Sequence, residues 1–196
     1  MAYTDFSAGT VLSDLGITTS VDELFGVLAP LVVPAWLPDL LLRGRRQVLS
    51  SEKARSEFIV APVLLAVQEV AGSQVSIYSG QRLDVDAARG LTGECDFILA
   101  AGPPVPGLTS PLLLVVEAKR NEVESGIWQC VAQMFAATLF NTQTGHPRPA
   151  VYGCVTNGEV WQFLRLHETN AVLDRQRYFI NDVGSILAIF RQITTQ

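Results

Sequence analysis

Two acidic residues and a lysine carry the clearest chemistry in this sequence. The apolar segment LLLVVEAKR, residues 112–120, ends by placing Glu117 and Lys119 two positions apart. Side chains alternate between the faces of a strand, so these two should project from the same face. In the upstream segment ECDFILAA, Asp96 precedes residues that are apolar on both faces, where an unpaired carboxylate is costly to bury. We therefore expect the three side chains to be partners.

Three kinds of chemistry fit two carboxylates and a lysine. The first is a structural ion pair with no further role. The second is a divalent-metal site, because Mg²⁺ takes oxygen ligands from one or two carboxylates and completes its shell with water and substrate phosphate. The third is a lysine that forms a Schiff base, although nothing else in the chain supports carbonyl chemistry. The net negative charge of the cluster at a strand end favours the metal site.

The pattern of apolar residues and turns predicts the elements that position this cluster. In chain order they are a helix over 51–72, strands over 74–80, 90–101 and 111–119, a helix over about 122–140, two strands over 148–167, an edge strand over 173–180 and a helix over 182–193. The strands within 148–167 should be joined at Asn157 and Gly158, a pair typical of tight hairpins. If the strands at 90–101 and 111–119 are antiparallel neighbours, Asp96 meets Glu117 and Lys119.

An apolar segment at residues 24–42 approaches the length of a membrane span. It contains three prolines and an aspartate, and lipid offers no partner for the carbonyls that the prolines would free. A span is therefore not expected. We divide the chain into an apolar N-terminal extension, residues 1–48, and a main domain, residues 49–196. The extension should pack on the main domain or across a homodimer interface.

Two short helices are expected within this extension. Ser20 and Glu23 have the spacing of a capping box, which predicts a helix that Pro30 ends. A second helix could begin at Pro38 and continue into LRGRR, residues 42–46.

Composition limits the class of protein. With 196 residues, 48% of them hydrophobic and 17% charged, the chain suits one domain with a sizeable core and is not disordered. A formal charge of -5 provides no broad basic field, so a polyanion must be met locally. Three cysteines (Cys95, Cys130 and Cys154) and two histidines assemble no zinc pattern. We expect reduced, buried thiols in a cytosolic protein, because the first residues do not resemble a signal peptide.

GECDFIL, VVEAK and a following helix that contains QCVAQMFAA together resemble the PD-(D/E)XK nuclease superfamily, which shares the fold of restriction endonucleases. The resemblance covers roughly residues 50–165. It implies an α/β fold with a mixed central sheet flanked by helices, in the order αβββαβ. Asp96 matches the family's first aspartate, Glu117 its second acidic residue and Lys119 its lysine. The long separation between Asp96 and Glu117 is explained by the proline-rich loop at 102–110.

The resemblance also implies a glutamate on the first helix. Glu57 is our choice and Glu52 is the alternative, because the apolar stripe of this helix lies between them. On the second helix Gln129 and Gln133 are one turn apart and share a face. Some family members place a glutamine beside the active site at this position, and we favour Gln133. A solvated helix surface is the alternative for each of these residues.

The activity that the resemblance implies is metal-dependent hydrolysis of phosphodiester bonds by an endo- or exonuclease acting on DNA. Asp96, Glu117 and the carbonyl of Ala118, with help from Glu57, would hold one or two Mg²⁺ or Mn²⁺ ions. Lys119 would orient a water and offset charge in the transition state. Two alternatives stay open, a non-catalytic binding or scaffolding module with the same fold and a small-molecule phosphohydrolase.

Cationic side chains that could meet nucleic acid gather before and within the first helix of the main domain. They are Arg43, Arg45, Arg46, Lys53 and Arg55. Three arginines nearer the C-terminus could add phosphate contacts, namely Arg175, Arg177 and Arg191. A solvated helix end also explains the first group. No base-reading motif is evident, so the sequence predicts no base specificity.

Overall fold

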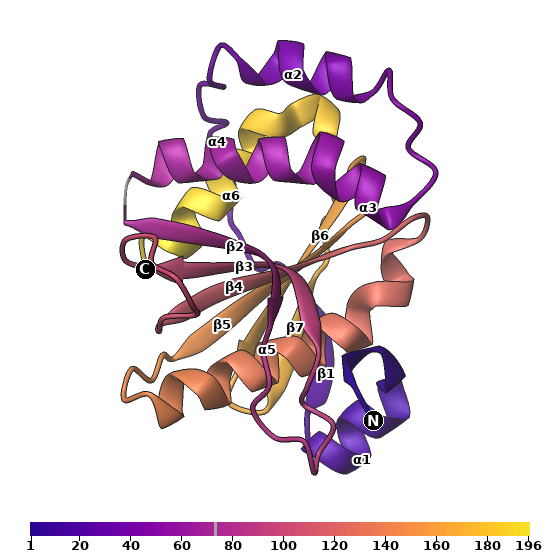
Figure 1. The fold of residues 1–196 in the computed structure, drawn as a ribbon, viewed down its shortest axis with the longest axis vertical. Coiled ribbons are helices and arrows are strands. Elements are labelled where there is room, and N and C mark those ends of the chain that lie inside the picture. Colours follow the sequence, from indigo (N-terminus) through magenta and orange to yellow (C-terminus); the bar gives the residue numbers. More distant parts are fainter. Residues whose placement is uncertain (73) are drawn as a thin grey trace.

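One mixed β-sheet, flanked by helices on both faces, forms the centre of the molecule in the computed structural model, which describes residues 1–72 and 74–196 (Figure 1). The strands are β1 (Thr18–Asp22), β2 (Val75–Arg82), β3 (Glu94–Ala101), β4 (Leu112–Ala118), β5 (Ala150–Thr156), β6 (Val160–His167), β7 (Asn170–Asp174) and β8 (Tyr178–Phe179). Their order across the sheet is β1-β7-β6-β5-β4-β3-β2, with β8 paired to β6. The pairs β4/β5 and β1/β7 are parallel, and the other pairs are antiparallel.

Helices cover the two faces of this sheet unequally. They are α1 (Ala8–Leu15), α2 (Leu37–Gly44), α3 (Glu52–Arg55), α4 (Ala61–Ala71), α5 (Ile127–Gln143) and α6 (Val183–Thr194). Helices α2, α4 and α6 lie on one face, and α1 and α5 lie on the other (Figure 1). Every side chain of β4 is buried, because helices cover this strand on both faces.

The two faces of the sheet belong to two apolar cores. Ile98 and Val115 join the core under α5, whereas Phe97 and Leu114 join the core under α4 and α6. Since side chains alternate along a strand, Glu117, two positions beyond Val115, also faces α5, where Gln133 contacts it. Asp96 instead lines a pocket with residues 52–61, while its neighbour Cys95 joins the core under α5.

The expected fold class is confirmed. The order α4, β2, β3, β4, α5, β5 is the expected αβββαβ order in a mixed sheet flanked by helices, and β2, β3 and β4 form the expected antiparallel meander. The hairpin between β5 and β6 turns at Asn157 and Gly158, where Gly158 has a φ of 88° that favours glycine. The three cysteines are free and buried, as expected.

The N-terminal residues include one element that the sequence did not predict. β1 lies at the edge of the sheet, parallel to β7, with Thr18 opposite Asn170 and Asp22 opposite Asp174. The helix expected from Ser20 is therefore wrong, because the exposed edge of β7 offers this segment more backbone hydrogen bonds than a capping box could. The second expected helix is confirmed as α2, which has a proline in its first turn.

Residues 1–48 also contribute buried side chains to both cores. Tyr3 and Val11 join the core under α5, and Phe25 and Leu37 join the core under α6. Whether this part forms a separate unit from residues 49–196 stays a prediction. In the described part of the chain, no helix is long and apolar enough to cross a membrane.

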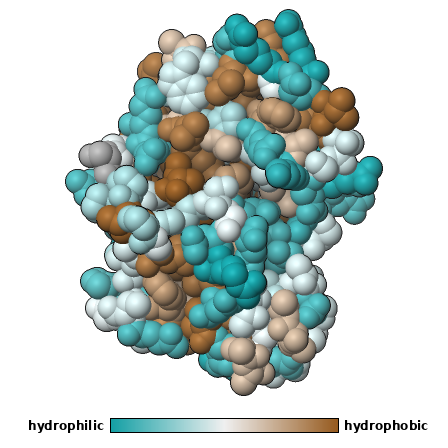
Figure 2. All heavy atoms as spheres, in the orientation of Figure 1, coloured by the Kyte–Doolittle hydropathy of each residue, from teal (hydrophilic) through white to brown (hydrophobic). Residues whose placement is uncertain are grey.

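Apolar side chains reach the surface where α2 and α4 meet. Leu40, Phe58 and Leu65 are exposed and line a groove of about 360 Å³ between these helices. Figure 2 shows hydrophobic residues at the surface in the upper half of the molecule, where the two helices lie.

Candidate functional site

The ends of β3 and β4 bring Asp96, Glu117 and Lys119 together. Asp96 directly precedes Phe97, which is paired with Val116. Its Oδ2 accepts a hydrogen bond of 2.7 Å from the backbone N–H of Ala118. The Nζ atom of Lys119 donates to Glu117 Oε1, also at 2.7 Å. The three side chains that the sequence singled out therefore share one end of the sheet.

Two glutamines of α5 complete this hydrogen-bond network. Gln133 Nε2 donates to Glu117 Oε2 at 2.9 Å, and Gln129 Oε1 accepts from Lys119 Nζ at 3.1 Å. The one-turn spacing of the glutamines matches the two-residue spacing of their partners on β4. Gln133 is fully buried, and within the described residues its Oε1 has no hydrogen-bond partner. Gln129, which the sequence did not favour, thus contacts the lysine directly.

Burial dominates the electrostatics of the two carboxylates. Desolvation raises the pKa of Glu117 to about 7, the charge of Asp96 acts in the same direction, and Lys119 and Gln133 act against it. Desolvation also raises the pKa of Asp96, while the Ala118 N–H and Lys119 oppose that rise. Both carboxyl groups therefore hold their negative charge at a cost, which a bound cation would reduce.

The neighbouring carboxylates favour the charged ammonium form of Lys119. Burial disfavours the ammonium form, but the carboxylates of Glu117, Glu52 and Asp96 outweigh it, and the pKa of Lys119 lies above its ordinary value. A Schiff base requires the neutral amine, which is the form that this environment disfavours. The geometry thus suits an electrostatic role for the lysine.

Glu52, the alternative helix residue, is the one that approaches this cluster. Its Oε1 lies 4.0 Å from Lys119 Nζ, whereas Glu57 Oε1 lies 3.8 Å from Lys53 Nζ. Glu52 and Glu57 nevertheless both line a pocket of about 470 Å³ that also includes Asp96. The structure thus brings Glu52, and not Glu57, to the lysine, and the choice of metal ligand between them stays a prediction.

A widened helical turn explains this arrangement. A π-helical turn over Ser56–Val60 separates α3 from α4, and the N–H of Ala61 bonds to the carbonyl of Ser56, five residues back. Pro62 has no N–H to offer the carbonyl of Phe58, so a regular turn loses a hydrogen bond here. One extra residue in a turn rotates the preceding helix by about 100° relative to a regular helix. A sequence pattern that assumes a regular helix therefore misplaces Glu52 and Glu57.

The donor atoms at this site suit Mg²⁺, which needs few protein ligands, better than an ion that is coordinated by protein side chains alone. Among the residues that the structure describes, no three His, Cys, Asp or Glu side chains are grouped so as to hold a metal. Mg²⁺ commonly uses only one or two carboxylates and leaves its other positions to water and substrate phosphate. Asp96, Glu117 and the Ala118 carbonyl are hard oxygen donors of this kind. The adjoining pocket leaves space for the other ligands.

Most cationic residues proposed for phosphate contacts are engaged by carboxylates. The pairs are Arg43 with Asp39, Arg45 with Glu159, Lys53 with Glu57, Arg175 with Asp22 and Arg177 with Glu124. Arg55 instead donates to the carbonyl of Asn157 at 2.8 Å. Exposed ion pairs of this type contribute about 1 kcal/mol or less, so a polyanion could displace the carboxylates.

Similarity to known proteins is found among solved structures only. No protein-family model matches the chain, and no curated protein is significantly similar to it. Among solved structures, one similar chain is that of the type IIG restriction endonuclease BpuSI, with a TM-score of 0.47 and 16% sequence identity. The similarity covers 87% of this chain and 18% of that chain. A similarity at this level does not establish a shared activity.

Proposed function

We propose that this protein is a metal-dependent nuclease that hydrolyses phosphodiester bonds in DNA. The observation that carries the proposal is the convergence of Asp96, Glu117 and Lys119 at one end of the sheet, beside an open pocket. Two desolvated carboxylates with raised pKa values, next to an ammonium group, form an environment that favours a divalent cation and a phosphate.

Each side chain of the site has a proposed task. Asp96, Glu117 and the carbonyl of Ala118 would hold Mg²⁺ or Mn²⁺, with Glu57 or Glu52 contributing from the helix. A divalent ion bound there would supply a water of lowered pKa and offset charge on the phosphate oxygens. Lys119 would orient the attacking water and stabilise negative charge, because its own pKa is raised.

The glutamines of α5 act on these groups rather than on the substrate. Gln133 is fully buried, so it cannot touch DNA, and its amide fixes the direction of the Glu117 carboxylate. Gln129 does the same for the ammonium group of Lys119. We therefore propose Gln133 as a positioning residue of the catalytic site.

One observation favours a second candidate function, a non-catalytic binding module. Both carboxylate oxygens of Glu117 already have partners, Lys119 and Gln133, so this carboxylate is compensated without a metal. A buried ion pair of this kind can persist for structural reasons alone. The two candidates differ in whether a cation can compete with Lys119 for Glu117.

Metal binding and cleavage, measured together, distinguish the two candidates. Calorimetric titration of the purified protein with Mg²⁺ and Mn²⁺ should detect binding, and incubation with plasmid, linear and single-stranded DNA should give cleavage. Cleavage of closed plasmid would indicate an endonuclease, and cleavage of linear DNA alone an exonuclease. A wild-type protein that binds neither ion and cleaves none of the three substrates would contradict the nuclease proposal.

Three variants assign the roles. Asp96→Asn should lose metal binding and cleavage, whereas Lys119→Met should lose cleavage and keep metal binding, because the lysine is not a ligand. Asp86→Asn is the matched control, since it removes a half-buried carboxylate that lies outside the site and is paired with Arg89. This control should match the wild type in both measurements.

A further inference from the structure

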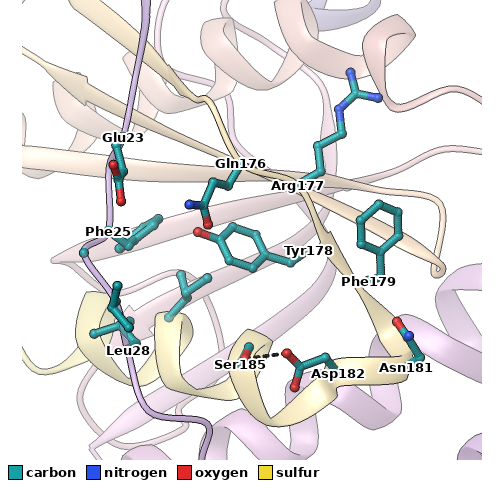
Figure 3. Close-up of a pocket in the computed structure, with 13 residues that line it drawn as sticks. Glu23, Phe25, Leu28, Gln176, Arg177, Tyr178, Phe179, Asn181, Asp182 and Ser185 are labelled. Atoms are coloured by element: carbon teal, nitrogen blue, oxygen red, sulfur yellow. Dashed lines mark hydrogen bonds between the residues drawn. The ribbon is translucent and has the colours of Figure 1, made fainter.

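A second pocket lies away from the metal site, between the segment that follows β1 and the first turn of α6 (Figure 3). Its volume is about 430 Å³. Residues 23–28 form one wall, residues 176–179 form the opposite wall, and the start of α6 forms the floor. None of these residues takes part in the network around Glu117, so the pocket requires its own explanation.

Aromatic rings line this pocket, and two of them are held in place by packing on Phe163. Phe25 is buried, with its ring centroid 5.8 Å from that of Phe163. Tyr178 packs on the same Phe163 at 5.6 Å, and its hydroxyl donates to the buried carboxylate of Asp174 at 3.0 Å. Phe179 is the exception, because 52% of its surface is exposed to solvent. Rings held in this way form a binding surface that needs little reordering on binding.

Three charged residues line this pocket, and two of them, Glu23 and Asp182, are acidic. Figure 3 shows the carboxylate of Glu23 directed toward the rings and Asp182 beside Ser185 at the floor, whereas the guanidinium of Arg177 points away. Arg177 bonds instead to Glu124. Within residues 1–72 and 74–196, no Lys, Arg or His side chain forms an ion pair with Glu23 or Asp182.

From this combination we propose that the pocket binds an organic cation, namely a guanidinium or alkylammonium group. Ring faces attract cations, and carboxylates at the rim form charge-assisted hydrogen bonds with their N–H groups. The side-chain amides of Gln176 and Asn181 offer further acceptor oxygens. A phosphate or carboxylate ligand would instead be repelled by Glu23 and Asp182. The required group occurs on free amines and on arginine side chains of partner proteins.

Matched probes test the charge requirement and separate these two sources. The probes are agmatine, the peptide acetyl-Ala-Ala-Arg-Ala-Ala-amide and the same peptide with citrulline, which is neutral and nearly the same shape. Calorimetry at low salt should detect binding of agmatine, of the arginine peptide or of both, and none of the citrulline peptide. Binding of agmatine alone would indicate a free amine, and binding of the arginine peptide alone a protein side chain. Equal binding of the arginine and citrulline peptides, or no binding of any probe, would overturn the proposal.

Substitutions within the pocket locate the binding. Glu23→Gln and Phe179→Ala should each weaken binding about threefold, as expected for one exposed charge pair or one cation–ring contact. Both side chains are exposed, so neither change removes core packing. Asp14→Asn is the control, because it removes an exposed carboxylate of α1 outside the pocket. If the control weakens binding as much as Glu23→Gln, attraction to the net charge of the protein explains the result and the proposed site is wrong.

Discussion

Glu117 has only 3% of its surface exposed, and its carboxylate depends on Lys119 and Gln133 for compensation. Transfer of a carboxylate from water to such a site favours the protonated form. At the scale of single residues, the site is therefore a balance between a buried acid and its neighbours. That balance can be measured without knowing the substrate.

We expect the metal-free protein to lose stability as the pH rises toward neutrality. The pKa of Glu117 is about 7 in the folded chain, against an ordinary value of 4.5. Between these values the folded state binds more protons than the unfolded state, so the contribution is complete below about pH 4.5 and is lost as pH approaches 7. The free energy of unfolding should fall by on the order of 3 kcal/mol across this window. Urea denaturation in the presence of EDTA, repeated at several pH values, measures this fall in the free energy of unfolding.

Glu117→Gln is the control for this effect, because glutamine keeps the size and shape of the side chain but does not titrate. The difference in unfolding free energy between wild type and variant should change with pH only in the window between about 4.5 and 7. Parallel pH profiles for the two proteins would show that Glu117 is not the titrating group.

Lys119→Met should destabilise the protein most at high pH. The change keeps an unbranched apolar stem but leaves the Glu117 carboxylate without its cation, a loss of about 3 kcal/mol for a buried pair. At pH 5 the loss should be smaller, because Glu117 is then protonated. Lys53→Met, which removes a lysine with an 83% exposed side chain, should change stability by less than about 0.5 kcal/mol. A pH-independent loss in Lys119→Met would contradict this account.

At the scale of elements, the π-helical turn at Ser56–Val60 connects the site to the packing of α2. Gly44 lies so close to this turn that a Cβ atom there would be 2.2 Å from the carbonyl oxygen of Phe58. That carbonyl is also the one that Pro62 leaves without its helical N–H partner. Helix α2 therefore packs directly against the π-helical turn, through Gly44 and the carbonyl of Phe58.

Gly44→Ala should be strongly destabilising, because the methyl group meets backbone atoms that cannot rotate away. We expect a loss of about 2 kcal/mol or more, as for overpacked sites. Gly26→Ala is the matched control, since a Cβ there has no neighbour within 4 Å. Chemical denaturation of the two variants measures both effects. Equal stabilities would mean that α2 does not pack against the turn as described.

At the scale of the whole molecule, the N-terminal residues are part of the central sheet. Removal of residues 1–22 would delete β1 and the buried side chains of Tyr3, Val11 and Ile17. Each such side chain contributes about 1.5–3 kcal/mol, and the free edge of β7 would be exposed to other chains. We expect a much lower melting temperature and aggregation in light scattering. A truncated protein that stays monodisperse and melts like the full chain would contradict this expectation.

The homodimer expected from the N-terminal extension remains a proposal. The region buries some apolar residues but leaves others at the surface, which are Val27, Val32, Leu40, Leu42 and Val48. Light scattering of the intact protein should give twice the mass of one chain. Leu42→Glu should reduce it to the mass of one chain, because it places a charge within the exposed apolar surface. A monomeric wild type would remove this proposal.

The sequence alone was sufficient for those features that depend on local periodicity. Alternation along two strands and the loop between them predict that Asp96, Glu117 and Lys119 come together. The structure has all three at one end of the sheet, where Lys119 bonds to Glu117 and Asp96 bonds to the backbone of Ala118. The αβββαβ order was predictable for the same reason, since apolar periods and the Asn157–Gly158 turn mark each element. Neither inference requires knowledge of distant parts of the chain.

Only the tertiary structure decided the features that depend on contacts between distant segments. Glu52 approaches Lys119 because the helix is widened where α2 packs on it, and a regular helical pattern contains no sign of this. Residues 18–22 form a strand because the edge of β7, about 150 positions away, offers hydrogen bonds that outweigh a local capping preference. The second pocket likewise exists only because residues 23–28 meet the start of α6. Local propensities are worth tenths of a kcal/mol per residue, and long-range packing and pairing exceed them.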